Sequence, residues 1–314
     1  MNPRPLDDDP TLSNAHRAAL RSIARVVEET APSTPPDEAL ERIVSMMREG
    51  PALVLTGAGV STDSGIPDYR GPHGSLTRHR PMTYQEFRHD PAASHRYWAR
   101  SFVGWRLMHR AAPNRVHFAI AELEHAGYVS GVVTQNVDGL HHTAGSRRLV
   151  ALHGDLSTVV CLNCGALEDR PGLDARLEAA NPGYLDSVEL DPNLVNPDGD
   201  VELTSTWVDR FRMVGCLACG SHMLKPDVVY FGEPVPGARK RAARELLRES
   251  SGLVVAGSSL AVMSGLRLAL DALRAGQPLA VVNGGPGRAD SRAGVVWRTS
   301  VAPAFDALLD ELSP

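Results

Sequence analysis

Short apolar runs and amphipathic stretches alternate along most of the chain, and this alternation predicts strands that are followed by helices. The runs ALVLT, YVSGVV, LVAL, GLVVA and PLAVV are short and rich in β-branched residues, which is typical of buried strands. Apolar residues recur at helical spacing in segments 37–50, 94–110, 114–127, 237–249 and 265–275. The pattern favours an α/β fold in which helices cover both faces of a parallel sheet.

Three other segments complete this pattern. A further helix is predicted around residues 14–29, before the proline-rich segment APSTPP. The segment DVVYFGE, residues 227–233, is predicted to be a strand and loop at which the α/β alternation resumes. Residues 158–225 have a different character, because they contain all four cysteines and a long stretch rich in Pro, Asn and Asp.

Polar or glycine-rich residues follow four of the predicted strands, at 57–61, 135–138, 257–259 and 283–285. In open parallel sheets, ligands bind beyond the carboxyl ends of the strands. We therefore expect these four segments to converge on one ligand site.

The composition restricts the class of protein. The chain has 314 residues, of which 43% are apolar and 22% charged, and its net charge is −5; these values are ordinary for a globular protein of one or two domains. No long basic block supports binding to nucleic acid or to a membrane surface. No apolar run approaches the roughly 18 residues of a membrane span, and the acidic N-terminal segment does not resemble a signal or transit peptide. We therefore expect a cytoplasmic protein.

The cysteines form two Cys-x-x-Cys pairs, each followed by glycine: Cys161, Cys164, Cys216 and Cys219. Four thiolates close a tetrahedral Zn²⁺ site and leave no position open for water, so that such a site is structural. The long stretch between the pairs requires an insertion between the two knuckles. Two unrelated thiol pairs, or a redox pair, are the alternative.

The segment LTGAGVSTDSGIPDYRG begins like a nucleotide-binding turn, with Gly57, Ala58 and Gly59 directly after a strand. Glycines let the backbone approach a pyrophosphate, and amides at a helix start bind its charge. Thr62 stands where a dinucleotide fingerprint has its third glycine, and no P-loop lysine follows. The segment LTRHRP also lacks the acidic residue that dehydrogenases place about 20 positions on. Hydride transfer is therefore disfavoured, and an ordinary tight turn remains an alternative.

Two further segments place polar groups at strand ends. In TQNVDGLH, the side chains of Gln135, Asn136 and Asp138 suit ribose hydroxyls and a carboxamide, although a polar turn explains them equally well. In LHGD, His153 is a candidate base, because the usual pKa of histidine, near neutrality, suits proton removal from a hydroxyl, although a single histidine is more often structural. The chain lacks Gly-x-Ser-x-Gly and His-Glu-x-x-His, which disfavours serine hydrolases and zinc proteases.

Taken together, seven segments resemble the sirtuins, a family of NAD-dependent protein deacylases. They follow the family's order from about residue 40 onward: GAGVSTDSGIPDYRG, TQNVDGLHHTAG, LHGD, CLNCG with CLACG, LKPDVVYFGE, GSSLAV and VNGG. The segments PDYRG, YWARSFVGW and GSRRL further resemble the class II branch, which includes a mitochondrial animal member.

The resemblance implies two domains. A Rossmann-like domain would comprise residues 37–72, 111–157 and 226–314. In the small domain, residues 73–110 would form a helical insertion and residues 158–225 a zinc-ribbon module. Residues 1–36 form an N-terminal extension outside the resemblance. NAD, which is consumed as a co-substrate, and an extended acyl-lysine peptide are expected to meet between the domains, whereas one zinc ion has a structural role.

The resemblance also assigns residues to each ligand. The expected NAD contacts are Gly57, Ala58, Gly59, Ser61, Asp68, Tyr69, Arg70, Gln135, Asn136, Val137, Asp138, Gly257, Ser258, Ser259, Asn283, Gly284, Gly285 and Val301. Many sirtuins have a Cys at the position of Val301, where its backbone meets adenine, and a backbone contact tolerates valine. The substrate peptide is expected to add a strand to Val229, Tyr230, Phe231, Gly232 and Glu233.

In the implied reaction, the acyl oxygen of the substrate attacks the anomeric carbon of NAD. His153 acts as general base on the ribose hydroxyls, and Asn136 and Asp138 complete the catalytic set. The products are nicotinamide, free lysine and 2′-O-acyl-ADP-ribose, and zinc takes no part. Two alternatives are a protein mono-ADP-ribosyltransferase that uses the same NAD site and a non-catalytic reader of acyl-lysine, which the intact set disfavours.

The sequence does not decide which acyl group the protein removes. Tyr97 and Arg100 lie i, i+3 on one predicted helix and resemble the Tyr-x-x-Arg pair with which desuccinylating sirtuins bind acidic acyl chains. Alternatively, Trp98 and Trp105 pack this helix and Arg100 forms a salt bridge. The expected partners are acyl-lysine proteins or peptides; the sequence predicts no oligomeric state.

Overall fold

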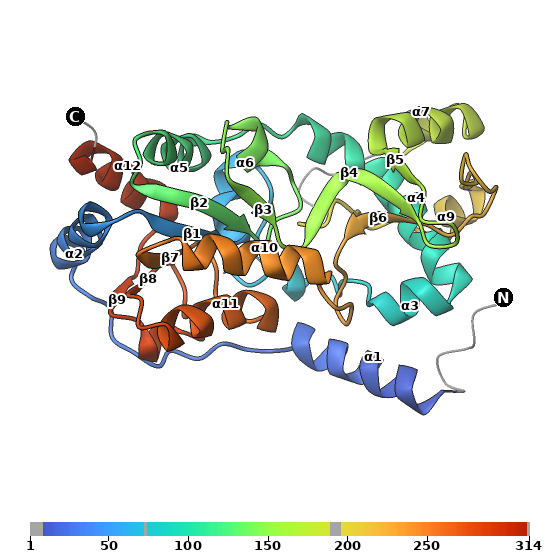
Figure 1. Cartoon of the computed structure of the whole chain (residues 1–314). Coiled ribbons are helices and arrows are strands. Elements are labelled where there is room, and N and C mark those ends of the chain that lie inside the picture. The colour runs from blue at the N-terminus through green and yellow to red at the C-terminus, as the bar shows by residue number, and fades with distance from the viewer. Residues whose placement is uncertain (1–8, 72–73, 189–195, 313–314) are drawn as a thin grey trace. The chain divides into compact units, whose positions relative to one another are not determined.

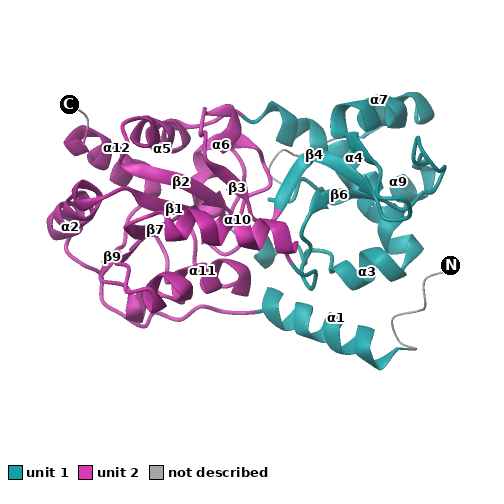
Figure 2. Ribbon diagram, viewed as in Figure 1, with its two compact units in different colours: residues 1–24, 74–111, 154–234 teal, residues 25–73, 112–153, 235–314 magenta. Residues whose placement is uncertain are grey.

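The computed structural model describes residues 9–71, 74–188 and 196–312 (Figure 1). They form two compact units (Figure 2), of which unit 1 is Met1–Ala24, Gly74–Ala111 and Gly154–Pro234, and unit 2 is Arg25–His73, Ala112–His153 and Val235–Pro314. Residues 226–234, which the sequence assigned to the Rossmann-like domain, belong to unit 1, and residues 25–36 of the predicted extension belong to unit 2. The domain boundaries themselves remain a prediction, and residues 1–8, 72–73, 189–195 and 313–314 within them lie outside the described residues.

Within the described part of unit 2, six parallel strands form one sheet in the order β3-β2-β1-β7-β8-β9. The strands are β1 (Ala52–Thr56), β2 (Val129–Thr134), β3 (Leu149–Ala151), β7 (Gly252–Ala256), β8 (Leu279–Val282) and β9 (Val295–Trp297). The chain builds outward from β1 in one direction through β3, and then from β7 in the other direction through β9. This is the strand order of dinucleotide-binding folds, and the order reverses between β1 and β7. The predicted Rossmann-like sheet is confirmed.

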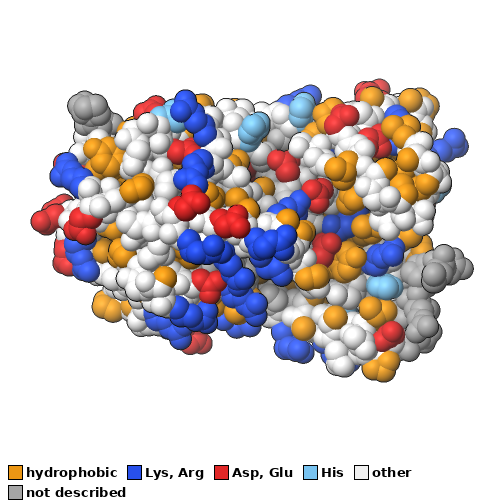
Figure 3. Space-filling model, viewed as in Figure 1, with side chains coloured by type: hydrophobic (Ala, Val, Ile, Leu, Met, Phe, Trp, Pro, Cys, Tyr) orange, Lys and Arg blue, Asp and Glu red, His pale blue; other side chains and the backbone are white. Residues whose placement is uncertain are grey.

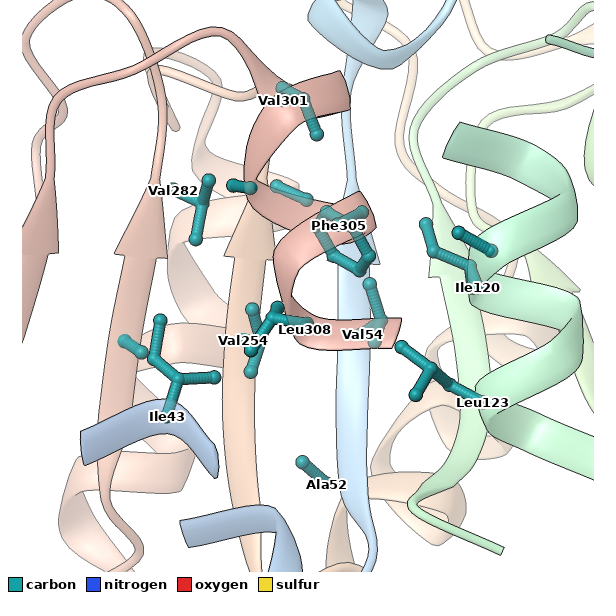
Figure 4. Packing of buried hydrophobic residues seen from close by; sticks show 14 of the residues in the cluster. Ile43, Ala52, Val54, Ile120, Leu123, Val254, Val282, Val301, Phe305 and Leu308 are labelled. Carbon is teal, nitrogen blue, oxygen red and sulfur yellow. The ribbon is translucent and has the colours of Figure 1, made fainter. Parts of the chain in front are cut away.

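Helices cover both faces of this sheet. One face packs on α2 (Pro36–Glu49), α5 (Arg115–His125) and α12 (Val301–Leu312), and Figure 4 shows Phe305 and Leu308 of α12 among the buried side chains of β1, β7 and β8. The helices α10 (Gly237–Arg248) and α11 (Met263–Arg274) contact the other face. Alternate strand residues face the two helical layers, and all five residues of β1 are buried. This double burial explains why the strands are mostly apolar.

Within the described part of unit 1, β5 (Leu167–Asp169), β4 (Gly154–Cys161) and β6 (Leu224–Val228) form a three-stranded antiparallel sheet. The helices of this unit are α1 (Pro10–Ile23), α3 (Tyr84–His89), α4 (Pro91–Arg110), α7 (Arg170–Ala180), α8 (Tyr184–Ser187) and α9 (Ser205–Arg210). Trp98 of α4 is fully buried, and its indole Nε1 donates to the carbonyl of Leu224 at 2.9 Å. The guanidinium of Arg170 is also buried and lies over the rings of Trp98 and Trp105. The interior of unit 1 therefore includes a charged group among its aromatic and aliphatic side chains.

Two predicted elements differ from the structure, and two elements of unit 2 were missed. The first helix begins at Pro10 and ends at Ile23 rather than spanning 14–29, because the carboxylate of Asp9 accepts from the amide of Thr11 and caps it. The strand placed at 227–233 is instead Leu224–Val228 and pairs with β4. As an edge strand it tolerates Pro226. The elements β9 and α12 were not predicted. No helix among the described residues is long and apolar enough to cross a bilayer.

Candidate active site

The polar segments that follow β1 and β7 lie against each other at the point where the strand order reverses. The amide of Gly57 donates to the carbonyl of Ala256 at 3.1 Å, and the amide of Gly59 donates to that of Gly257 at 2.9 Å. A Cβ atom on Gly59 would lie 2.9 Å from the Cα of Gly257, and Gly257 itself has a φ of +59°. Larger residues would therefore force the two turns apart.

Ser61 organises the segment that follows β2. Its hydroxyl is buried, donates to Oδ2 of Asp138 at 2.7 Å and accepts from Nδ2 of Asn136 at 3.0 Å. The other carboxylate oxygen of Asp138 accepts from the amide of Leu140 at 2.9 Å, at the start of α6 (Leu140–Thr143). Three of the predicted site residues are thus joined in one hydrogen-bonded group.

Two buried histidines that the sequence did not single out lie beneath this group. Nε2 of His117 is 3.5 Å from Ser61 Oγ, and Nε2 of His141 is 3.0 Å from the hydroxyl of Thr56. The two rings are 4.8 Å apart. Burial lowers the pKa of His117 to about 4 and that of His141 to about 3, so both rings are neutral at physiological pH. Their sequence signal is weak, since His117 lies within an amphipathic helix and His141 stands beside His142 after a polar turn.

The side chain of Gln135 joins the ends of three strands. Its Nε2 donates to the hydroxyl of Ser258 after β7 at 2.7 Å and to the carbonyl of Thr56 in β1 at 3.3 Å. Its backbone carbonyl accepts from His153, after β3. Gln135, which follows β2, therefore links the end of β1 to Ser258 after β7 and to His153 after β3.

The remaining predicted nucleotide contacts also belong to unit 2. Asn283, after β8, donates from Nδ2 to the carbonyl of Gly285 at 2.7 Å, and the carbonyl of Ser259 accepts from the amide of Arg288 at 2.9 Å. The carboxylate of Asp68 accepts from the amide of Gly71 at 2.8 Å and closes the turn that contains Tyr69 and Arg70. The carboxyl ends of β1, β2, β3, β7 and β8 thus all supply residues of the predicted site: Gly57, Ala58, Gly59, Ser61, Gln135, Asn136, Val137, Asp138, His153, Gly257, Ser258, Ser259, Asn283, Gly284 and Gly285.

The imidazole of His153 has partners at both nitrogens. Nδ1 lies 2.9 Å from the carbonyl of Gln135, and Nε2 lies 2.6 Å from the hydroxyl of Ser264. Burial lowers the pKa of His153 to about 4, the bond to Gln135 opposes this shift, and the charge of Arg239 adds to it. The ring is therefore neutral near pH 7 and offers a nitrogen that can accept a proton.

Arg239 belongs to a basic surface of unit 2. Figure 3 shows Lys and Arg side chains gathered over α10 and α11. The sequence of α10, GARKRAARELLR, contains five cationic residues, and its first turn has no acidic one. Although the net charge of the chain is −5, helix α10 presents a positive surface. Arg239 of this helix lowers the pKa of His153 through its charge.

In unit 1, the four cysteines form a cluster in which their Sγ atoms lie within 4.8 Å of one another. The short separations connect the two pairs: Cys161 to Cys219 is 3.7 Å and Cys164 to Cys216 is 3.8 Å. Zinc–sulfur bonds of about 2.3 Å in a tetrahedron place the sulfurs about 3.8 Å apart. The donor set therefore fits one structural Zn²⁺, and the arrangement disfavours the redox alternative within each Cys-x-x-Cys pair.

The predicted acyl-chain residues in α4 are engaged within unit 1. Arg100 forms an ion pair with Glu202, and its Nη1 lies 4.0 Å from Oδ2 of the buried Asp200. The ring of Tyr97 is fully buried and packs edge-on against Phe87 and Tyr230. These contacts match the structural alternative for Arg100, a salt bridge, and the role in acyl binding stays a prediction.

The predicted peptide-binding segment, 229–233, is not a regular strand. The carbonyl of Phe231 accepts from the amide of Tyr84 at 2.8 Å, and the carboxylate of Glu233 accepts from the amide of Tyr230 at 3.0 Å. Glu233 also pairs with the buried ammonium of Lys225 at 3.0 Å. The segment is closed by a turn of its own, because the amide of Glu233 donates to the carbonyl of Tyr230 at 3.0 Å and Gly232 has a φ of +85°.

The model of the Sir2 family matches residues 57–264. This match spans the glycine turn, the Ser61 group, His153 and all four cysteines. The chain belongs to the Sir2 family.

Curated relatives agree with this assignment. The chain is 66% identical over 274 residues to NAD-dependent protein deacetylase 1 of Corynebacterium efficiens, covering 87% of this chain and 98% of the relative. It is 40% identical to NAD-dependent protein deacylase Sirt4 of Drosophila melanogaster, covering 87% and 88% of the two chains. The sequence prediction of a sirtuin is confirmed at the level of the family.

Solved structures show the same fold. A Sir2 complex with a p53 peptide and NAD⁺ superimposes with a TM-score of 0.67 at 29% identity, covering 87% of this chain and 98% of that one. A Sir2 structure bound to a propionylated peptide gives a TM-score of 0.66 at 27% identity, with coverage of 87% and 98%. This Sir2-family chain therefore has the architecture of enzymes that have been solved with acylated peptides.

Proposed function

We propose that the protein removes acyl groups from lysine side chains of other proteins in a reaction that consumes NAD. It is an NAD-dependent protein deacetylase, as its relatives are named. The observation that most directly supports this function is that the neutral imidazole of His153 and the Ser61 group both lie at the carboxyl edge of the parallel sheet. One edge of the sheet thus offers both a nucleotide site and a base.

The residues at this edge suit the parts of NAD. The paired turns of Gly57, Gly59 and Gly257 bring backbone atoms close together, as a pyrophosphate site requires. The amides of Asn136 and Gln135 and the carboxylate of Asp138 suit a ribose and a carboxamide. When bound, NAD would supply an anomeric carbon whose bond to nicotinamide breaks as a bond to the acyl oxygen forms.

His153 acts as the general base in this proposal. Its Nδ1 hydrogen is bound by the carbonyl of Gln135, so Nε2 is the atom that accepts a proton from a ribose hydroxyl. Asn136 and Asp138 are held by Ser61 and orient the sugar. The zinc cluster has no open coordination position and supports the fold of unit 1.

The substrate class is proteins or peptides with an acyl-lysine, bound along residues 229–233. Homologous Sir2 structures contain p53 and propionylated peptides. Because Arg100 is already neutralised by Glu202 and Asp200, small uncharged acyl groups such as acetyl fit better than acidic ones. If glutaryl-lysine were instead preferred and Arg100→Met abolished that preference, this part of the proposal would be wrong.

The class II branch is a further part of the proposal. The segments YWARSFVGW and PDYRG support it, and so does the similarity to Sirt4 of Drosophila. This branch is also linked to protein mono-ADP-ribosylation, which would use the same NAD site. The two activities differ in where the ADP-ribose goes.

Mass analysis of the products separates these activities. The purified protein is incubated with NAD and an acetyl-lysine peptide, and the peptide, the protein and the nucleotide are each weighed. We expect deacetylated peptide, nicotinamide and O-acetyl-ADP-ribose in equal amounts. ADP-ribosylated protein with an unchanged peptide would instead establish the transferase, and NADH absorbance would indicate a dehydrogenase.

A further inference from the structure

The start of α11 contacts two residues of the site at once. Ser264 is the second residue of this helix, and its hydroxyl lies 2.6 Å from Nε2 of His153. The next residue is Gly265, where a Cβ atom would lie 2.5 Å from Oε1 of Gln135. The Ser264-Gly265 step therefore places the helix directly against both Gln135 and His153.

The hydrogen bonds define the state of the His153 ring. A backbone carbonyl can only accept, so the bond to the carbonyl of Gln135 requires a hydrogen on Nδ1. In the neutral ring, Nε2 then has a lone pair. The hydroxyl of Ser264 is the donor to this lone pair, at 2.6 Å.

Helix capping does not account for Ser264. A serine near a helix start is usually explained by an N-cap bond to the backbone. Here the N-cap residue is Val262, and it makes no side-chain cap bond. The contact that the structure gives the Ser264 hydroxyl is the one to His153.

We propose that Ser264 is a positioning residue that holds His153 in the neutral tautomer with Nε2 as the acceptor. The catalytic consequence rests on the proposed function, whereas the effect on the ring does not. In the free protein, the hydroxyl of Ser264 donates to Nε2 of His153, the same nitrogen that would accept a proton from a ribose hydroxyl during turnover. Gly265 is the matching element, because it lets α11 approach closely enough for Ser264 to reach the ring.

The consequence for protonation has a definite sign. A donor to Nε2 stabilises the neutral ring and opposes the imidazolium, in which Nε2 has its own hydrogen. The charged group that acts on His153 in the structure is Arg239 of α10, which works in the same direction and is unchanged in a Ser264 variant. Loss of the hydroxyl should therefore raise the pKa of His153.

The test is a histidine ¹⁵N NMR titration of the zinc-loaded protein without NAD or peptide, with His153 assigned from the His153→Ala spectrum. We expect the Nδ1–H tautomer and a pKa well below the usual value in the native protein. Ser264→Ala should shift this pKa upward by about half to one pH unit. Ser264→Thr should restore it, and Ser264→Cys, with a weak thiol donor, should lie between.

Kinetics provide the second measurement. The acidic limb of kcat/KM should move to higher pH in Ser264→Ala, so that activity at pH 6 falls several-fold more than activity at pH 8. An unchanged or lowered pKa in Ser264→Ala would overturn the proposal, and so would a large loss of kcat at all pH values with an unchanged titration. Because the NMR experiment uses no substrate, a failure of the deacylase proposal would leave this result interpretable.

Discussion

The two units are stabilised by different forces. Unit 2 has a continuous apolar cluster in which a parallel sheet is buried between helices, with side chains such as Ile43, Val54 and Phe305 at zero exposure. Unit 1 buries Arg170 and Lys225 together with aromatic rings, and it contains the cysteine cluster. We infer from this difference that unit 2 folds by burial of apolar surface, whereas unit 1 also needs a metal ion and paired polar groups.

The difference also separates stability from chemistry. The predicted catalytic residues follow the strands of unit 2, where a rigid sheet fixes their spacing. The cysteines of unit 1 form a closed set with no position for a substrate. Changes to each unit should therefore have different signatures.

Removal of zinc should have the largest effect on stability. Structural zinc contributes on the order of 10 kcal/mol to folding, so a strong chelator or Cys161→Ser should abolish amide protection in β4, β5 and β6. Protection in β1, β2 and β7 should persist. Hydrogen exchange with mass spectrometry measures both regions in one sample.

The exposed Leu217, which lies between the cysteines of the second knuckle, provides the control. Leu217→Ala keeps every ligand and should leave zinc content and protection unchanged. If chelation left β4 to β6 fully protected, or if it exposed β1 equally, the contrast between the units would be wrong.

A core truncation in unit 2 should have the next largest effect. Phe305 is fully buried in the cluster that Figure 4 shows. Phe305→Ala should lower the free energy of unfolding of unit 2 by about 3–5 kcal/mol, and denaturant-dependent exchange of β1 and α5 amides measures this loss. The half-exposed Phe118 on α5 is the control, since Phe118→Ala should cost far less. If Phe305→Ala destabilised unit 2 only after zinc had been removed, the separate stabilisation of the two units would be contradicted.

The smallest expected effect concerns Asp198 in unit 1. Burial, and secondarily the charge of Asp200, holds the pKa of Asp198 well above its usual range. The folded state therefore retains a proton that the unfolded chain has released, and stability falls as the pH rises from about 4 through the folded-state pKa. Asp198→Asn removes this loss and should stabilise unit 1 by about 1–2 kcal/mol at pH 8.

The gain from Asp198→Asn should be much smaller at pH 4.5, where the native carboxyl is protonated in the folded state. Thermal unfolding at the two pH values measures the difference. The exposed Asp209 is the control, and Asp209→Asn should change stability by less than about 0.5 kcal/mol at either pH. Equal gains at both pH values would remove burial of Asp198 as the cause.

The same contrast explains which elements the sequence could predict. The strands of unit 2 are apolar runs followed by polar turns, so β1, β2, β7 and β8 were located, together with the convergence of their carboxyl ends. In unit 1, β6 contains a lysine and a proline within LKPDV. Its pairing with β4 is a tertiary contact that no local pattern encodes, and the strand was placed too late in the chain.

The site was predictable where a motif names the residue and not where a partner lies elsewhere in the chain. Gln135, Asn136, Asp138 and His153 follow strands within recognisable segments. Ser264, by contrast, is more than 100 residues from His153 in sequence and is the second residue of an ordinary amphipathic helix. Contacts of this kind depend on the packing of α11, so they become visible only in the structure.

The most direct test of the account is a comparison of His153→Ala with the native protein in one preparation. Zinc content, amide protection in both units and turnover of an acetyl-lysine peptide with NAD are measured together. The account predicts one zinc ion per chain, unchanged protection outside the His153 loop and a deacetylation rate lower by at least a hundredfold. A variant that folds, binds zinc and deacetylates at nearly the native rate would contradict it.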